Sequence, residues 1–172
     1  MAFVLRLFFL LLVFCLSASG VLTVGLVDGV CAQTSNPSFC RAALLSESAT
    51  ADLTGLGYVA IDVATANTRA AITKINGLKG QTKDVEFQNR LDSCFGEYTR
   101  VIDRYCTDAR RSLAYRDYAG MYVAGDLLTI DAFECDRLFS IAPSYTCPIT
   151  FEDKKTALLG GIIRTIAHIL DK

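Results

Sequence analysis

Cysteines carry most of the chemistry that this sequence could support. Cys31 and Cys40 enclose eight residues, and Asn36-Pro37-Ser38 between them is a turn signal. The spacing predicts two short helical segments that fold back on each other and are joined by a Cys31–Cys40 disulfide. Such a disulfide contributes about 2–3 kcal/mol to stability. A zinc half-site is the alternative, but the spacing is wide for two thiolate ligands and the chain has one histidine.

That histidine, His168, is the other side chain typical of catalysis. Nucleophilic catalysis needs a histidine that faces a serine or cysteine nucleophile in a cleft. His168 instead falls in the last turn of a predicted helix, where a cation interacts favourably with the helix C-terminus. The acidic residues Asp131, Glu134 and Asp136 are interpreted as a solvated face rather than a catalytic pair. We therefore expect no enzyme activity, no metal and no cofactor.

The N-terminal segment indicates that the protein is exported to an oxidising environment. Residues 1–20 contain one early charge, Arg6, then an apolar run and a group of small residues, which is typical of a signal peptide cleaved after Gly20. The apolar run is shorter than the ~20 residues that a membrane span needs. Cleavage would also remove Cys15, so six of the seven cysteines would remain, with 15 formal pairings. We expect a secreted protein of one domain.

The charge balance excludes two classes of protein. Loss of Arg6 takes the basic residues from 17 to 16, against 18 acidic residues. This near-neutral chain has neither the basic surface of a nucleic-acid binder nor an acidic tail.

Beyond the hairpin, apolar residues recur at helical spacing and predict four long helices. Their expected ranges are 52–80, 84–113, 117–139 and 152–170. The predicted inward stripes include Tyr122 on the third helix and Leu158 and Ile169 on the fourth. Short links favour an all-α, up-down-up-down four-helix bundle in residues 47–172, preceded by the disulfide-stapled N-terminal helical hairpin in residues 21–46.

A second disulfide follows from helix geometry. Cys94 lies about 21 residues before the turn at Tyr115-Arg116, and Cys135 lies about 20 residues after it, so both are ~30 Å from that turn. Both fall on inward stripes of adjacent antiparallel helices, which predicts a Cys94–Cys135 bridge. Cys106 and Cys147 are then interpreted as unpaired thiols; the alternative is that these two remaining cysteines pair with each other.

Several motifs resemble the plant invertase and pectin methylesterase inhibitor family. They are C-x8-C with Asn-Pro-Ser before Cys40, the Asp52-Leu53-x-Gly55-Leu56 helix start, Cys94 followed by F-G-E-Y, and the E-C-D-R-L-F run at Cys135. The resemblance covers nearly all of the mature chain, with a single inhibitor domain over residues 28–171. It implies a stapled hairpin on a four-helix bundle, with the same two disulfides. The chain also resembles the plane-pollen allergen group of this family.

The resemblance implies a secreted inhibitor that acts by direct contact with an enzyme of the cell wall, or of the vacuole. We favour pectin methylesterase as the partner, because the N-P-S-F-C run resembles the esterase inhibitors. Acid invertase is the alternative, because Glu134 and Asp131 resemble the acidic residues that invertase inhibitors carry before the fourth family cysteine. The Pro-Lys-Phe motif of those inhibitors, expected after Asp117, is replaced by Tyr118-Ala119-Gly120. A non-inhibitory allergen-like or ligand-carrying bundle is a remoter alternative.

The same resemblance nominates an enzyme-contact surface. In the esterase inhibitors the second and third bundle helices meet the enzyme, with positions around the fourth cysteine taking part. Carried over to this sequence, and restricted to residues expected to point outward, the surface has five members. They are Arg100 and Asp103 on the second helix, and Asp131, Glu134 and Arg137 on the third.

Overall fold

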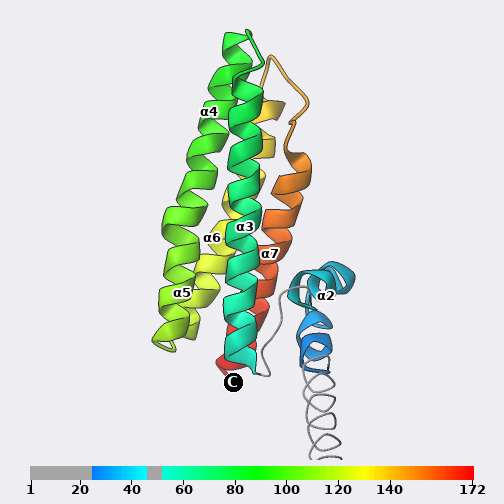
Figure 1. The fold of residues 1–172 in the computed structure, drawn as a ribbon, viewed down its shortest axis with the longest axis vertical. Coiled ribbons are helices and arrows are strands. Elements are labelled where there is room, and N and C mark those ends of the chain that lie inside the picture. The colour runs from blue at the N-terminus through cyan, green and yellow to red at the C-terminus, as the bar shows by residue number, and fades with distance from the viewer. Residues whose placement is uncertain (1–24, 46–51) are drawn as a thin grey trace, which may run out of the picture.

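The computed structural model describes residues 25–45 and 52–172, which are helical apart from turns and loops (Figure 1). The predicted signal peptide and the polar loop Ser46–Thr50 lie outside these residues. Within them the predicted architecture is confirmed: a helical hairpin precedes an up-down-up-down bundle, and no β-strand is present. None of the described helices is both long and apolar enough to cross a membrane.

The hairpin consists of a helical segment at residues 25–31 and helix α2, Pro37–Leu45. Pro37 occupies the first helical position, where its missing N–H has no partner to lose. The Asn36 side chain accepts a hydrogen bond from the Phe39 N–H at 3.1 Å and so caps the helix. The predicted Cys31–Cys40 disulfide is confirmed, with a Cα–Cα distance of 5.4 Å. The hairpin packs on the bundle through buried apolar side chains such as Leu44.

The bundle begins with α3, Leu53–Lys79. The second predicted helix is continuous but has three parts: α4, Val85–Arg100; a π-helical segment, η1, Val101–Cys106; and α5, Thr107–Ala114. Helices α6, Tyr118–Ser140, and α7, Thr150–Leu170, complete it. The residues at three predicted helix starts, Asp52, Asp84 and Asp117, each accept a hydrogen bond from a backbone N–H of the first turn, which satisfies a donor that the helix itself leaves unpaired.

The π-helical segment η1 corrects the prediction of one regular α-helix over residues 84–113. In η1 the chain is wider than in an α-helix, and the Thr107 hydroxyl donates to the carbonyl oxygen of Ile102, five residues back, at 3.1 Å. Apolar periodicity does not reveal such a segment, because the inward residues Val101 and Tyr105 keep their spacing through it.

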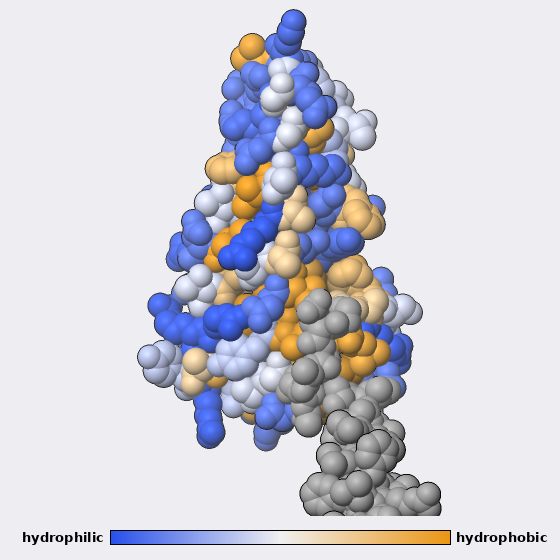
Figure 2. Space-filling model, in the orientation of Figure 1, coloured by the Kyte–Doolittle hydropathy of each residue, from blue (hydrophilic) through white to orange (hydrophobic). Residues whose placement is uncertain are grey.

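The bundle core contains two clusters of buried side chains. One lies beside the hairpin and includes Leu56 and Ile166; the other surrounds the second disulfide and includes Tyr98 and Phe139. Figure 2 shows the face over α3, where hydrophilic side chains dominate the upper half and hydrophobic ones gather in the lower half. Figure 1 shows that the hairpin lies beside this lower, more apolar half of the bundle.

Two of the inward positions named above are wrong. Tyr122 is 42% exposed, and Leu158 is only partly buried and belongs to neither core cluster. Ile169 is also partly buried but packs against the cluster beside the hairpin, as predicted. The fourth helix instead buries Leu159 and Ile163. The reason is that α6 and α7 approach closely at Gly125 and Gly160, which leaves larger side chains next to this contact, such as Tyr122 and Leu158, near the surface.

Helices α6 and α7 approach each other closely at Gly125 and Gly160. A Cβ atom at Gly160 would lie 2.4 Å from the Thr129 hydroxyl oxygen and 2.5 Å from the Gly125 carbonyl oxygen. One of these atoms is backbone, so a methyl group there requires the helices to separate. A Cβ atom at the neighbouring Gly161 would meet no atom within 4 Å, so a methyl group fits there without any movement of the helices.

This contrast gives a matched pair of variants. Gly160→Ala should lower the free energy of unfolding by about 1–3 kcal/mol, because overpacking forces α6 and α7 apart. Gly161→Ala should raise it by up to ~1 kcal/mol, because alanine favours the helix. Urea titration followed by circular dichroism measures both. Equal effects of the two substitutions would contradict the close packing at Gly160.

Candidate functional site

The Cys94–Cys135 disulfide joins α4 to α6 within the core cluster that includes Tyr98 and Phe139. Both cysteines are fully buried, and their Cα atoms are 5.2 Å apart, as the helix geometry predicted. Cys106 and Cys147 are free, which confirms the interpretation of both as unpaired thiols. Cys106 belongs to the cluster beside the hairpin, whereas Cys147 packs on the cluster around the disulfide.

Arg100 links α4 and α6, the two helices joined by this disulfide, through ion pairs. Its Nη1 lies 2.6 Å from a carboxylate oxygen of Glu97 on α4 and 3.2 Å from a carboxylate oxygen of Asp131 on α6. Helical periodicity places Glu97 on the solvated face, yet it takes part in this junction. Burial raises the pKa of Glu97 more than the nearby Arg100 lowers it. The arrangement holds the end of α4 against the middle of α6.

Asp131 does not point outward, which corrects its predicted position. It is buried, with 8% of its surface exposed, and faces α4, where it pairs with Arg100 and lies against Tyr105. Burial, followed by the negative charge of Asp131, raises the pKa of Tyr105. Helical periodicity suggested an outward side chain because an aspartate is rarely buried without a cation, and the arginine that neutralises it comes from another helix.

The other three nominated residues do reach the surface. Glu134 and Arg137 form an ion pair one turn apart on α6, with the Arg137 Nε donating to Glu134 at 2.7 Å. That hydrogen bond lowers the pKa of Glu134. Asp103 on η1 is exposed. Arg100 and Asp131 are therefore brought into contact, Glu134 and Arg137 form a second pair, and Asp103 makes no ion pair with the described residues.

Exposed apolar side chains on α6 add a feature that sequence reasoning missed. Val123, Ile130 and Phe133 are 55%, 55% and 54% exposed. At ~100° per residue, Val123, Ile130 and Arg137 follow one line along the helix, with Phe133 and Glu134 on either side. We call Val123, Ile130, Phe133, Glu134 and Arg137 the α6 outer strip. Val123, Ile130 and Phe133 fall outside the buried stripe of α6. Apolar residues outside the inward stripe were the sequence signal that could have revealed this surface.

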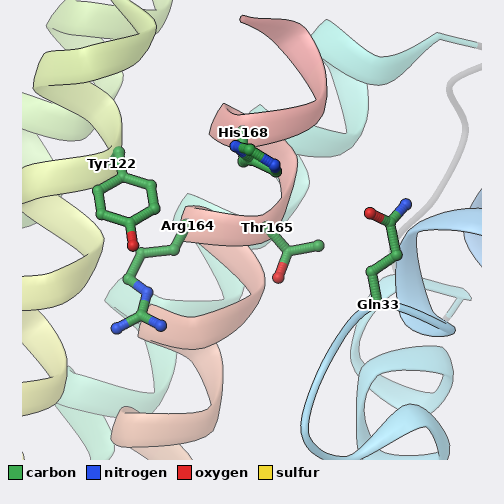
Figure 3. Close-up of a pocket in the computed structure, with 5 residues that line it drawn as sticks. All are labelled: Gln33, Tyr122, Arg164, Thr165 and His168. Carbon is green, nitrogen blue, oxygen red and sulfur yellow. The ribbon is translucent and has the colours of Figure 1, made fainter. Parts of the chain in front are cut away.

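His168 lies on the surface, as expected for the last turn of α7. It lines a hollow of about 210 Å³ between α6, α7 and the hairpin, together with Gln33, Tyr122, Arg164 and Thr165 (Figure 3). Arg164 pairs with Asp126 at 2.5 Å, and its guanidinium lies 5.4 Å from the centre of the Tyr122 ring. Among the residues that line this hollow there is no serine, cysteine or carboxylate to form a hydrolytic pair with the imidazole.

A second polar cluster lies inside the bundle. The Tyr98 hydroxyl donates to Asp153 at 2.6 Å, and the Cys147 thiol donates to the other Asp153 oxygen at 3.6 Å. Ligand atoms of Cys135, Cys147 and Asp153 lie within 4.8 Å of one another. The group does not fit a metal ion, because a ligating cysteine must be a thiolate and the Cys135 sulfur is in a disulfide.

The Arg100 junction predicts a difference between two arginines. Arg100→Met should lower the free energy of unfolding by about 1–3 kcal/mol, because Asp131 is left buried without its cation. Arg137→Met should change it by less than ~1 kcal/mol, because that pair is exposed. Chemical denaturation compares them, and Arg100→Met/Asp131→Asn should recover part of the loss. A larger effect at Arg137 would contradict the assigned roles.

The interior cluster predicts a dependence of stability on pH. Burial raises the pKa of Asp153 to about 7, with Asp136 adding to the rise and the hydrogen bond from Tyr98 opposing it. Between pH ~4 and 7 the folded protein therefore holds a proton that the unfolded chain has lost. Stability should fall by up to ~1.4 kcal/mol per pH unit across that window and level off above it.

The measurement is the free energy of unfolding from pH 4 to 8 for the wild type and Asp153→Asn. Asparagine keeps the size of the side chain and one acceptor oxygen but does not titrate, so the pH dependence of the difference between the two curves isolates this carboxyl group. The wild type should lose stability relative to the variant as pH rises towards 7. A constant difference would show that Asp153 titrates at its ordinary value.

Comparison with known proteins agrees with this geometry. Residues 25–142 match the family model described as plant invertase/pectin methylesterase inhibitor. A pectinesterase inhibitor of Actinidia deliciosa is 30% identical over 147 residues, which cover 84% of this chain and 79% of that protein. A protein of Platanus acerifolia named "Putative invertase inhibitor" is 28% identical, over 99% of this chain and 98% of its own length.

Two solved structures have the same fold as this chain. The crystal structure of mutant form A of a pectin methylesterase inhibitor from Arabidopsis superimposes with a TM-score of 0.71 at 25% identity, covering 81% of this chain and 93% of that one. A second crystal structure of a pectin methylesterase inhibitor, from Arabidopsis thaliana, has a TM-score of 0.64 at 24% identity, and it covers 86% of this chain and 97% of that chain.

Proposed function

We propose that this chain, which belongs to the plant invertase/pectin methylesterase inhibitor family, is a secreted protein that inhibits pectin methylesterase by direct contact. The observation that carries the proposal is the α6 outer strip, an exposed apolar and charged surface on a helix that is covalently fixed to α4. The inhibitor names of the relatives from Actinidia and Arabidopsis support the choice of enzyme.

The α6 outer strip has the properties of a protein-binding surface. Phe133 and Ile130 supply apolar area that a partner can bury, and aromatic side chains are frequent among the residues that dominate binding energy. Glu134 and Arg137 flank them and already pair with each other, so they are preordered in the free protein. A surface that is ordered before binding loses less conformational entropy when the complex forms.

Arg100 and Asp131 have a supporting role in this proposal. Asp131 is buried and therefore is not available to an enzyme. Of the two acidic residues nominated before Cys135, only Glu134 remains a candidate contact. Arg100 is partly exposed beside it and fixes α4 against α6. We therefore revise the enzyme-contact set to the α6 outer strip, with Arg100 of α4 beside it and Asp103 exposed on η1.

Acid invertase is the second candidate partner. The observation that favours it is the similarity to the Platanus protein over almost the whole chain. Glu134 remains available at the surface, whereas the Tyr118-Ala119-Gly120 segment lacks the lysine and phenylalanine of the motif expected there. The two enzymes are distinguished by titration rather than by fold.

The test is a titration of one plant pectin methylesterase and one acid invertase with the recombinant mature chain. We expect inhibition of the esterase, and a loss of at least tenfold in its inhibition constant for Phe133→Ala and for Glu134→Ala. Tyr115→Ala is the matched control, because Tyr115 is also an exposed aromatic residue, 80% exposed, near the opposite end of α6. It should change the constant less than twofold.

Each other outcome has a definite meaning. Inhibition of invertase alone would show that the partner is invertase and not the esterase. Equal potency of Phe133→Ala, Glu134→Ala and wild type would move the interface away from the α6 outer strip. Inhibition of neither enzyme would overturn the proposed function and leave the fold. Thermal unfolding of each variant establishes whether a loss of potency is a loss of structure.

A further inference from the structure

The free thiol of Cys147 lies beside the disulfide that joins α4 to α6. The Cys147 Sγ, the Cys135 Sγ and a carboxylate oxygen of Asp153 all lie within 4.8 Å of one another. Cys147 also packs on the core cluster that contains Cys94 and Cys135. A nucleophile and a disulfide are thus almost in contact, with a proton acceptor next to them.

We propose that Cys147 exchanges with this disulfide to form an alternative Cys135–Cys147 bridge. The Cys147 thiolate attacks the Cys135 Sγ, the Cys94–Cys135 bond breaks as the new bond forms, and Cys94 leaves as a thiolate. Cys94 then takes up the proton that Cys147 lost. One disulfide and one thiol are present before and after the step, so it consumes no oxidant or reductant.

The location of the three sulfur atoms allows the exchange without unfolding a helix. Cys94 and Cys135 lie in the middle of α4 and near the end of α6, whereas Cys147 lies in the connection between Ser140 and Thr150. The attack therefore moves a loop towards a fixed helix. The new bridge would join residues 12 apart in the sequence, in place of residues 41 apart.

The same surroundings keep the exchange slow in the resting protein. The Cys147 thiol donates a hydrogen bond to Asp153 at 3.6 Å, and burial raises its pKa to about 12, with Asp153 and Asp136 adding to the rise. Backbone and side-chain groups of Ile149 and Thr150 act in the opposite direction. Since only the thiolate attacks, the rate should increase about tenfold per pH unit well below that pKa.

The exchange would release α4 from its covalent link to α6. Arg100 and the core side chains would still hold the helices together. The disulfide of Cys135, however, would then connect α6 to the loop that follows it instead of to α4. If the α6 outer strip is the inhibitory surface, exchange would loosen its support; this consequence rests on the proposed function, whereas the exchange itself does not.

The experiment is disulfide mapping of the full mature chain. The oxidised protein is incubated at pH 7, 8 and 9, quenched with acid, alkylated with N-ethylmaleimide and digested without reduction. We expect a Cys135–Cys147 peptide and an alkylated Cys94 to appear together. Their rate of formation should rise about tenfold per pH unit and should not depend on protein concentration.

Two variants serve as controls. Cys106→Ser should exchange as the wild type does, because Cys106 belongs to the other core cluster, whereas Cys147→Ser should form no new bridge. An intact Cys94–Cys135 peptide with alkylated Cys147 at every pH would overturn the proposal. New bridges that involve Cys31, Cys40 or Cys106 equally often would also overturn it, because they would show exchange in the unfolded chain. The wild-type map decides even if a variant fails to fold.

Discussion

The Cys94–Cys135 disulfide is the constraint on which the rest of this structure depends. It fixes the distance and the register of α4 and α6 at one point, and the Arg100–Asp131 ion pair repeats the connection nearby. Arg100 lies six residues beyond Cys94 and Asp131 four residues before Cys135, which places both ~6–9 Å from the disulfide in the same direction along antiparallel helices. Two links of different kinds thus hold one helix pair.

The other side of α6 is held by a different kind of contact. Gly125 and Gly160 let the backbones of α6 and α7 approach closely, and this contact leaves no room for a side chain. With α4 on one flank and α7 on the other, α6 has one face left for solvent, and that face carries Val123, Ile130 and Phe133. The exposed strip is therefore presented by a helix that is held on both sides.

Much of the fold could be predicted from the sequence. Helix ranges followed from apolar spacing, and the second disulfide followed from counting residues on either side of one turn. The π-helical segment could not be predicted, because its inward residues keep an α-like spacing. It depends on backbone hydrogen bonds, which a pattern of side chains does not record.

The candidate site was less accessible to sequence reasoning. Glu134 and Arg137 lie at the surface, as helical spacing predicted, but Asp131 was wrongly assigned to the surface because its cation, Arg100, lies on another helix. The apolar members of the α6 outer strip were missed because apolar residues were expected to face the core. Both errors concern side chains whose position is decided by contacts between helices rather than by the periodicity of one helix.

Hydrogen–deuterium exchange of the protein, free and bound to pectin methylesterase, tests the central claim most directly. We predict that binding slows exchange in peptides over residues 123–138 of α6 and 97–103 of α4 and η1, and leaves the hairpin and α3 unchanged. Protection confined to the hairpin or to α3 would contradict the claim that the disulfide-linked helix pair carries the inhibitory surface.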